Sequence, residues 1–208
     1  MSHGLCLFGG SFDPPHAAHL RMARAAAERL RPERFVVMPC AQNPLKERTT
    51  VATAEQRTAL CRLAFAEIPR VEISTLEIER GSPSYTIDTV LALRSEIGID
   101  PPLWILCGAD VLPQLDRWKE VHSLLEIATL VVCPRVGQAI DARTLDRLAI
   151  RRRHKEAILE NLLPIDADAT SSTAIRAALA AGRTPEGLSP RVLEFIRRQQ
   201  LYLDQDPR

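Results

Sequence analysis

Several patterns that mark common classes of protein are missing from this 208-residue sequence. No apolar run approaches the ~18 residues of a membrane span, and no basic segment followed by an apolar core opens the chain. The five cysteines are widely spaced, without a Cys-x-x-Cys pair. An odd number of unpaired cysteines favours reduced, buried thiols, so we expect a soluble protein of the cytoplasm.

Motifs of several large enzyme classes are also absent. The first apolar run is not followed by Gly-x-Gly-x-x-Gly, which argues against a dinucleotide-binding dehydrogenase, and no Gly-x-x-x-x-Gly-Lys-Ser/Thr loop indicates a P-loop enzyme. No set of cysteines and histidines has zinc-site spacing, and no serine has the context of a nucleophile elbow. We therefore expect neither a protein-bound metal nor a serine nucleophile.

Charge is nearly balanced, with a formal net charge of +1, which gives no general attraction to nucleic acid or to a membrane. Affinity for anions must therefore come from local sites. Apolar residues make up 46% of the chain and charged residues 25%, which is typical of a globular protein. The length suits one domain, and no linker or repeat divides the chain, so we expect a single domain over residues 1–208.

Short apolar runs alternate with helical patterns along most of the chain. The runs that predict strands are Leu5–Phe8, Phe35–Met38, Val71–Ser74, Leu103–Cys107 and Leu130–Cys133. The helical patterns between them are His16–Leu30, Ala54–Ile68, Thr86–Ile97 and Val111–Ile127. Parallel strands need such crossover connections, and runs that are apolar throughout are typical of strands buried on both faces. The alternation predicts an α/β fold, a Rossmann-like doubly wound parallel sheet.

The pattern of the C-terminal third predicts only helices, which would form a small helical part after the sheet. A charged helical pattern covers Ile140–Leu162 and includes the basic cluster Arg151–Lys155. We interpret that cluster as a solvated helix face rather than a binding patch, because charge runs on helices are usually solvated. A short helix ending at Gly182 and an amphipathic helix over about Pro190–Leu201 complete the chain.

The most informative stretch is Gly9–His19, Gly-Gly-Ser-Phe-Asp-Pro-Pro-His-Ala-Ala-His, between the first strand and the first helix. Glycines allow a sharp turn and a close approach of the backbone to a ligand, and prolines preset a first helical turn. His16 and His19 are three residues apart, so we expect them on one face, beside the positive end of the helix dipole. This stretch predicts a binding site for a polyphosphate.

A second candidate anion site lies far along the chain, at Ser171-Ser172-Thr173 followed by Ala174-Ile175-Arg176. Three hydroxyl residues at a helix start can be explained by capping alone. The same hydroxyls, the helix N–H groups and the Arg176 guanidinium could also grip phosphate oxygens.

Together the two stretches resemble the signature of the nucleotidyltransferases that carry a T/HxGH motif, above all the bacterial nicotinate-nucleotide adenylyltransferases. Gly-Gly-Ser/Thr-Phe-Asp-Pro-x-His-x-Gly-His and Ser-Ser/Thr-Thr-x-Ile-Arg are typical of that family. Ala18 stands where the family usually has glycine, and we expect it to alter the fit more than to abolish binding. The resemblance implies transfer of the adenylyl group of ATP to nicotinate mononucleotide, giving nicotinate adenine dinucleotide and pyrophosphate in NAD biosynthesis.

Four further segments resemble the same family in the same order. Pro44-Leu45-Lys46 resembles its Pro-His-Lys loop, with leucine in place of histidine, and Ser84-Tyr85-Thr86-Ile87-Asp88-Thr89 resembles a segment that helps hold the pyridine carboxylate. Gly108-Ala109-Asp110 and Trp118 resemble the segment in which the aspartate contacts a ribose and the tryptophan stacks on the nicotinate ring. Pro134-Arg135-Val136-Gly137 resembles an Arg-Pro-Gly loop near the adenosine.

The resemblance therefore implies three groups of site residues. The catalytic group is His16, His19, Lys46 and Arg176. The group that binds ATP is Gly9, Gly10, Ser11, Phe12, Arg135, Ser172, Thr173 and Ile175. The group that binds the second substrate is Tyr85, Thr86, Gly108, Asp110 and Trp118. We expect Mg²⁺ to arrive with ATP, since no carboxylate cluster is dedicated to it, and we expect small-molecule substrates with no nucleic acid or membrane partner.

These residue types suit a reaction without a general base. The attacking phosphate is already anionic, so the site has to align two anions and stabilise the charge of the leaving pyrophosphate. Three alternatives stay open: the second substrate could be nicotinamide mononucleotide or phosphopantetheine, or the chain could be a non-catalytic nucleotide-binding regulator. Ala18 and Leu45 raise the last alternative, because both depart from the family pattern. The Asn43–Lys46 loop is the segment we expect to move on binding.

Overall fold

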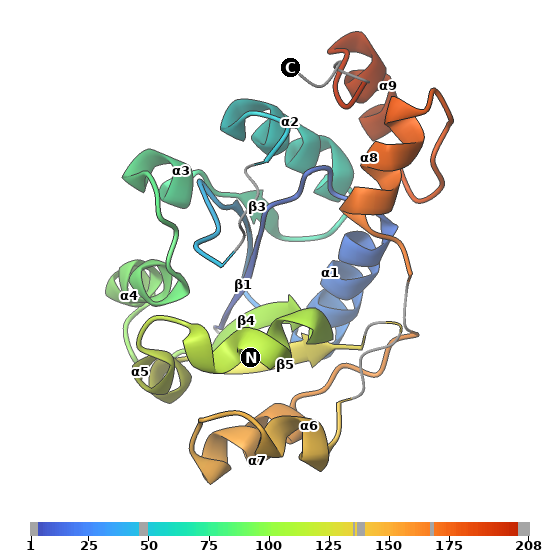
Figure 1. Ribbon diagram of the computed structural model, residues 1–208. Helices are drawn as coiled ribbons and strands as arrows, with labels where there is room; N and C mark the ends of the chain where they lie inside the picture. The colour runs from blue at the N-terminus through green and yellow to red at the C-terminus, as the bar shows by residue number, and fades with distance from the viewer. Residues whose placement is uncertain (1–3, 46–49, 135, 137–139, 167–168, 204–208) are drawn as a thin grey trace.

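A five-stranded sheet, in the order β3-β2-β1-β4-β5 with all neighbours parallel, forms the centre of the computed structural model (Figure 1). The structure describes residues 4–45, 50–134, 136, 140–166 and 169–203. The strands are β1 (Leu5–Gly10), β2 (Arg34–Pro39), β3 (Val71–Ile73), β4 (Leu103–Gly108) and β5 (Thr129–Cys133). This arrangement confirms the predicted Rossmann-like doubly wound fold.

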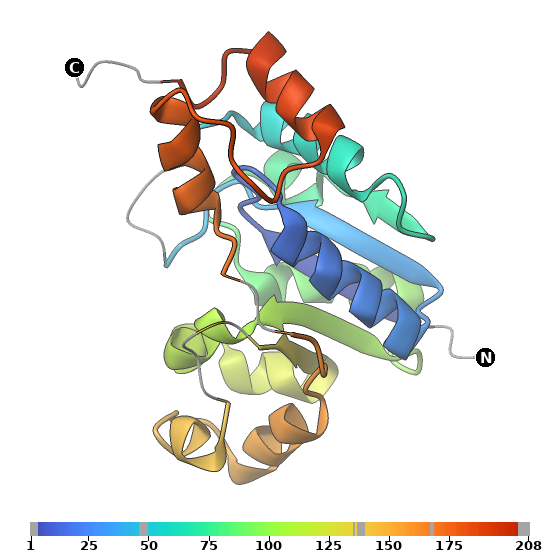
Figure 2. The ribbon, with the colours of Figure 1, turned by 90° about the vertical axis from the view of Figure 1, so that its right-hand side faces the viewer.

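Helices cover both faces of this sheet, which explains why its strands are apolar throughout. Cys6 and Phe8 of β1 point to the face covered by α1 and α2, whereas Leu5 and Leu7 point to the face covered by α4 and α5. Figure 2 shows α1 lying along one face with the strands behind it. The α-helices are α1 (Ala17–Leu30), α2 (Ala54–Phe65), α3 (Leu76–Arg80), α4 (Thr86–Ile97), α5 (Val121–Ile127), α6 (Ala142–Asp146), α7 (Arg152–Glu160), α8 (Ser172–Ala180) and α9 (Pro190–Arg198).

The C-terminal helices α8 and α9 form a third apolar cluster with α2. Ile175 and Leu179 of α8 and Val192 and Ile196 of α9 pack around Leu60 of α2. Figure 1 shows α8 and α9 beside α2 at one end of the molecule, while α6 and α7 lie at the opposite end, next to β5. None of the helices in the described part of the chain is long and apolar enough to cross a membrane.

Two predicted helices are broken in the structure. The pattern at Val111–Ile127 becomes a 3-10 helix, η1 (Ala109–Arg117), followed by the separate helix α5. Pro113 lies inside η1 and disfavours a continuous α-helix, because it lacks an N–H and its ring clashes with the preceding turn. The pattern at Ile140–Leu162 becomes α6 and α7, and Leu148 and Ile150 in the connection between them are buried.

The three arginines of the basic cluster Arg151–Lys155 are paired with acidic side chains, whereas His154 within it is buried. Arg151 and Arg153 both donate hydrogen bonds to Glu126 of α5, and Arg152 donates to Glu156 at 2.7 Å. These exposed pairs support the interpretation of the cluster as a solvated helix face.

Candidate active site

The candidate site lies at the carboxyl ends of β1 and β4. Strands β2 and β4 flank β1 on opposite sides, and the helices that follow β1 and β4 cover opposite faces of the sheet. The loops after β1 and β4 therefore diverge. Such a reversal of strand order leaves a crevice beyond the strand ends, where ligands of this class of fold bind.

Two adjoining cavities occupy this crevice, with volumes of about 840 Å³ and about 370 Å³. The larger cavity is bordered by the turn after β1 and the start of α8, and the smaller one by the start of α4 and the end of η1. The wall common to both includes Gly9, Gly10, Asn43, Leu45, Asp110 and Arg117. A ligand in one cavity would therefore lie directly beside a ligand in the other.

The turn after β1 is open at Gly9 and tightly packed at Gly10. A Cβ on Gly9 would meet no described atom within 4 Å, whereas a Cβ on Gly10 would lie 3.0 Å from the Phe12 ring. Phe12 has a φ of 47°, an uncommon conformation for a bulky residue. Its ring is 2% exposed and packs edge-on against Phe8 and Phe65, so it fills the core behind the turn. Of the residues expected to bind ATP, Phe12 thus has its side chain in the core.

His16 and His19 stand together at the start of α1, as the sequence predicts. Their ring centroids are 3.8 Å apart, and the backbone N–H of His16 donates to Nδ1 of His19 at 3.2 Å. His19 borders the larger cavity, whereas His16, the N-cap residue, is only 2% exposed. The N–H of Ala17 donates to the carbonyl of Gly187 at 2.8 Å. This part of the helix N-terminus, which we expected to face phosphate, is therefore occupied by the C-terminal part of the chain.

The predicted second anion site forms at the start of α8. Ser171 caps the helix, because its Oγ accepts a hydrogen bond from the N–H of Ala174 at 3.2 Å. Ile175 is 2% exposed and packs into the cluster with α2 and α9. Capping thus accounts for one of the three hydroxyl residues, and the expected ATP contact of Ile175 could involve only its backbone.

The other residues of this segment face the turn after β1. Ser172, Thr173 and Arg176 border the larger cavity. Nη1 of Arg176 donates to the carbonyl of Asp13 at 2.6 Å, and Oγ of Ser172 donates to the carbonyl of Pro14 at 2.9 Å. The structure therefore brings the two predicted anion motifs, far apart in sequence, onto one cavity.

Asp13, which the sequence analysis did not single out, is a buried carboxylate residue that also borders this cavity. It accepts hydrogen bonds from the backbone N–H groups of Val51 and Ala52, at 2.8 and 3.1 Å, and from the hydroxyl of Tyr202 at 2.8 Å. Burial raises the pKa of Tyr202, and the charge of Asp13 raises it further. One side chain thus joins three distant segments.

Ser11, expected to bind ATP, borders the larger cavity, and its backbone carbonyl accepts a hydrogen bond from a buried arginine. Nη1 of Arg57, a residue of α2 with 1% exposure, donates to the carbonyl of Ser11 at 2.9 Å. The Cys40 thiol donates weakly to Oγ of Ser11 at 3.8 Å. Burial of an arginine needs polar partners, and here the turn backbone supplies one.

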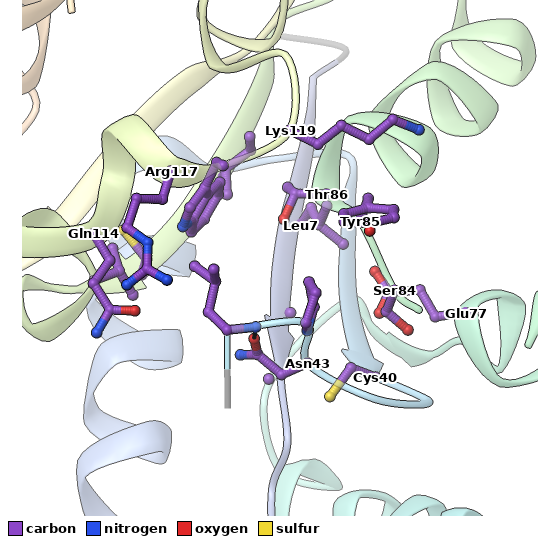
Figure 3. Close-up of a pocket in the computed structure, with 18 of the residues that line it drawn as sticks. Leu7, Cys40, Asn43, Glu77, Ser84, Tyr85, Thr86, Gln114, Arg117 and Lys119 are labelled. Atoms are coloured by element: carbon purple, nitrogen blue, oxygen red, sulfur yellow. Dashed lines mark hydrogen bonds between the residues drawn. The ribbon is translucent and has the colours of Figure 1, made fainter. Parts of the chain in front are cut away.

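The smaller cavity contains most residues expected to bind the second substrate. Tyr85 is the N-cap of α4 and Thr86 its first residue, and both border this cavity together with Trp118. Figure 3 shows Gln114 and Arg117 on one side of the cavity and Tyr85 on the other. Two aromatic side chains, Tyr85 and Trp118, in the lining of a cavity of this size suit a planar ring as ligand.

Asp110 and Gly108 follow β4, where the sequence predicts a ribose contact. Asp110 is exposed and borders both cavities, and Gly108 ends β4 and borders the larger one. Nearby, Nζ of Lys119 lies 4.9 Å from the centre of the Tyr85 ring and pairs with Asp88 at 2.9 Å. Lys119 was not among the predicted site residues, although it directly follows Trp118 in the sequence.

Glu77 is a buried carboxylate in the wall of the smaller cavity that the sequence analysis also missed. The hydroxyl of Thr89 donates to its Oε1 at 2.7 Å, and Nη2 of Arg80 donates to Oγ of Thr89 at 2.8 Å. Burial raises the pKa of Glu77, and hydrogen bonds from Thr89 and Ser84 oppose that increase. Figure 3 shows the Glu77 carboxylate next to Ser84. A buried ionisable group in a cavity wall is typical of functional sites.

Two predicted site residues, Lys46 and Arg135, lie outside the described residues. Leu45, beside Lys46 in the sequence, borders both cavities. Ala18, where the family pattern has glycine, is 3% exposed within α1.

Comparison with known proteins identifies the family. The chain matches the model of the cytidylyltransferase-like family over residues 7–178. A probable nicotinate-nucleotide adenylyltransferase of Chromobacterium violaceum is 38% identical, with 94% of this chain and 97% of the relative covered. One from Aeromonas salmonicida is 41% identical, with 94% of this chain and 95% of the relative covered. The chain belongs to the nicotinate-nucleotide adenylyltransferases.

Solved structures agree with this membership at the level of the fold. Plasmodium falciparum nicotinic acid mononucleotide adenylyltransferase, solved in complex with NaAD, is 19% identical and has a TM-score of 0.74, with 96% of this chain and 97% of that chain covered. A putative nicotinate-nucleotide adenylyltransferase of Vibrio parahaemolyticus has a TM-score of 0.67 at 17% identity. The relatives and the family model confirm the resemblance inferred from the sequence, and this nicotinate-nucleotide adenylyltransferase is a nucleotidyltransferase enzyme.

Proposed function

We propose that this nicotinate-nucleotide adenylyltransferase joins the adenylyl group of ATP to nicotinate mononucleotide and releases pyrophosphate. The observation that carries the proposal is the pair of adjoining cavities, which share a wall at Gly9, Gly10 and Arg117. Transfer between two nucleotides requires both to lie side by side with their reacting phosphates in contact. The larger cavity suits ATP, and the smaller one suits the mononucleotide.

His19 of α1 and Arg176 of α8 would contact the ATP phosphates in the larger cavity. Both side chains border it, with the hydroxyls of Ser172 and Thr173 beside Arg176. A guanidinium can hold two phosphate oxygens at once, and hydroxyls add neutral donors. His16 would support His19 through its stacked ring, and Lys46, predicted from sequence alone, would add a further cation.

The reaction itself needs little from the protein beyond alignment and charge. A phosphate oxygen of the mononucleotide would attack the α-phosphorus of ATP, and the bond from that phosphorus to the oxygen bridging to the β-phosphate would break. The attacking oxygen is already anionic, so no general base is required. The cationic side chains that border the larger cavity would stabilise the charge that accumulates on pyrophosphate.

The second substrate would lie with its pyridine ring against Trp118 and its carboxylate near the start of α4. Tyr85 and Thr86 lie there, and the unpaired N–H groups of a helix start favour an anion. Asp110, which borders both cavities, is placed to accept hydrogen bonds from a ribose hydroxyl.

Mg²⁺ would enter as a complex with ATP. The described residues hold no group of three or more His, Cys, Asp or Glu side chains that could bind a metal ion. Binding through substrate phosphates with a single carboxylate nearby is a common mode for this ion, and the Asp110 carboxylate borders the larger cavity. When bound, Mg²⁺ would neutralise part of the phosphate charge. We further propose the cytoplasm as the compartment, since all five cysteines are buried free thiols.

An assay of pyrophosphate release tests the proposal. The purified chain is mixed with Mg²⁺, ATP and one of three acceptors: nicotinate mononucleotide, nicotinamide mononucleotide or phosphopantetheine. We expect rapid release with nicotinate mononucleotide and slower release with the other two. Faster release with either alternative would reassign the substrate, and ATP binding without any release would indicate a nucleotide-binding regulator.

A further inference from the structure

We infer that Tyr202 is a positioning residue of the ATP site: its hydrogen bond to Asp13 couples the C-terminal helices to the turn that holds the phosphates. The inference rests on the proposed use of the larger cavity for ATP. Tyr202 lies 189 positions after Asp13 in the chain, beyond α9, and is absent from the cavity lining. It would therefore act on ATP through its neighbours and not by contact.

The hydrogen bond is buried and strong. Tyr202 is 5% exposed, Asp13 is 5% exposed, and the hydroxyl-to-carboxylate distance is 2.8 Å. Hydrogen bonds to charged groups contribute more than those between neutral groups, and the low dielectric of the interior strengthens them further. Breaking this bond would leave the Asp13 carboxylate with fewer donors in a place that water does not reach freely.

Asp13 connects Tyr202 to two parts of the lining of the larger cavity, Arg176 and the segment that follows Thr50. Its carbonyl accepts from Nη1 of Arg176, and Oδ2 of its carboxylate lies 3.8 Å from the same nitrogen. Its carboxylate also holds the N–H groups of Val51 and Ala52, directly after Thr50, which borders the cavity. A shift of Asp13 would therefore move Arg176 and the segment at residue 50 together.

The C-terminal part is tied to the same turn at two further points. Oγ of Ser172 donates to the carbonyl of Pro14, and the carbonyl of Gly187 accepts the N–H of Ala17 at the start of α1. A Cβ on Gly187 would lie 2.7 Å from the Thr170 side chain, so the backbone approaches closely here. These contacts attach α8 and the loop that follows it to the turn beside the larger cavity.

The test compares the wild type with Tyr202→Phe, which removes the hydroxyl and keeps the ring in the cluster with Val192 and Ile196. Dissociation constants for Mg²⁺-ATP and for nicotinate mononucleotide are measured by calorimetry, with the melting temperature of each protein. We expect Tyr202→Phe to raise the dissociation constant for ATP about tenfold, which is ~1.4 kcal/mol of binding free energy. The dissociation constant for the mononucleotide should change by less than about twofold.

Two control variants separate positioning from loss of packing or of any C-terminal hydrogen bond. Val192→Ala removes methyl groups from the same cluster, and Thr184→Ala removes the hydrogen bond that Nη2 of Arg197 donates at 3.0 Å. Both should leave the ATP constant within about twofold of wild type, although Val192→Ala lowers the melting temperature. The inference is wrong if Tyr202→Phe binds ATP like the wild type, weakens both ligands equally, or is matched by Val192→Ala.

The outcome for Tyr202 is separate from the outcome for the proposed function. A wild-type chain that binds ATP without releasing pyrophosphate with any acceptor would overturn the proposed function, while the ATP constants would still decide the role of Tyr202. A wild-type chain that does not bind ATP would overturn both.

Discussion

The imidazole rings of His16 and His19 contact each other in a tilted arrangement, with centroids 3.8 Å apart and planes inclined by 33°. Since His19 borders the larger cavity and His16 is buried, the pair divides into one residue that can contact phosphate and one that holds it in place.

His19→Ala should lower turnover by about 100-fold or more, within the range seen when one preorganised charge stabiliser is lost. Pyrophosphate release at saturating ATP and nicotinate mononucleotide measures this. His122→Ala, a change on α5 at a distance from both cavities, should leave turnover near the wild-type value. A His19→Ala enzyme within a few-fold of wild type would remove His19 from the proposed catalytic group.

Trp118→Ala should raise KM for nicotinate mononucleotide far more than KM for ATP. The reason is that Trp118 borders the smaller cavity and not the larger one. Initial rates with each substrate varied in turn give both constants. Trp104→Phe changes a residue of β4 that packs against the apolar cluster with α1 and α2. It should lower the free energy of unfolding with little effect on either KM. Equal changes in both constants for Trp118→Ala would mean that the indole has a structural role.

Gly9→Ala should weaken ATP binding, whereas Gly10→Ala should lower the stability of the protein. Gly9 has open space where a Cβ would stand, so Gly9→Ala should keep its melting temperature and raise KM for ATP, because the methyl group enters the space of the ligand. Gly10→Ala should lose stability, because its Cβ would press on the Phe12 ring. Thermal unfolding and ATP kinetics of the two variants provide the comparison. A destabilised Gly9→Ala with normal ATP kinetics would contradict the role proposed for that position.

Glu77→Gln should change how stability depends on pH. Burial keeps the pKa of Glu77 above its ordinary value in the folded protein, so the folded state holds a proton there more readily than the unfolded chain. That stabilisation is complete below the ordinary pKa and is lost as pH rises through the folded pKa. Glutamine cannot ionise, so the free energy of unfolding of Glu77→Gln relative to wild type should increase from about pH 4 to about pH 7.

Urea unfolding at several pH values measures this difference. Glu79→Gln alters an exposed carboxylate of the same short helix and serves as the control. A difference between Glu77→Gln and wild type that decreases over this range would show that the Glu77 carboxylate is stabilised, and not destabilised, by its surroundings.

Most of the fold could be predicted from the sequence, because its signals are local. Runs such as Leu103–Cys107 are apolar in every residue, which indicates strands buried on both faces. The helical patterns between the runs supply the crossover connections that a parallel sheet requires. The break inside Val111–Ile127 was missed although Pro113 indicated it. Helix α3, with its partly buried face on β2, has only five residues and gives too short a pattern to recognise.

The candidate site could be predicted only where a motif marked it. His19, Arg176 and Trp118 follow recognisable strings and were found. Asp13 lies within such a string, but its partners Val51 and Tyr202 are 38 and 189 positions away, and no local pattern connects them. Contacts between distant segments depend on the tertiary fold, and so the supporting residues behind the cavities became visible only in the structure.

The larger cavity is bordered by residues from near the start of the chain, from its middle and from α8. A form of the protein in which α8 and α9 detach would lose Ser172, Thr173 and Arg176 from that cavity at once. ATP would therefore bind only when both ends of the chain are docked, and its binding energy would oppose local opening. Saturating ATP should accordingly slow the amide hydrogen exchange of α8 and α9 even though the ligand touches few of their residues. Bound ATP would then hold the first and last parts of the chain together.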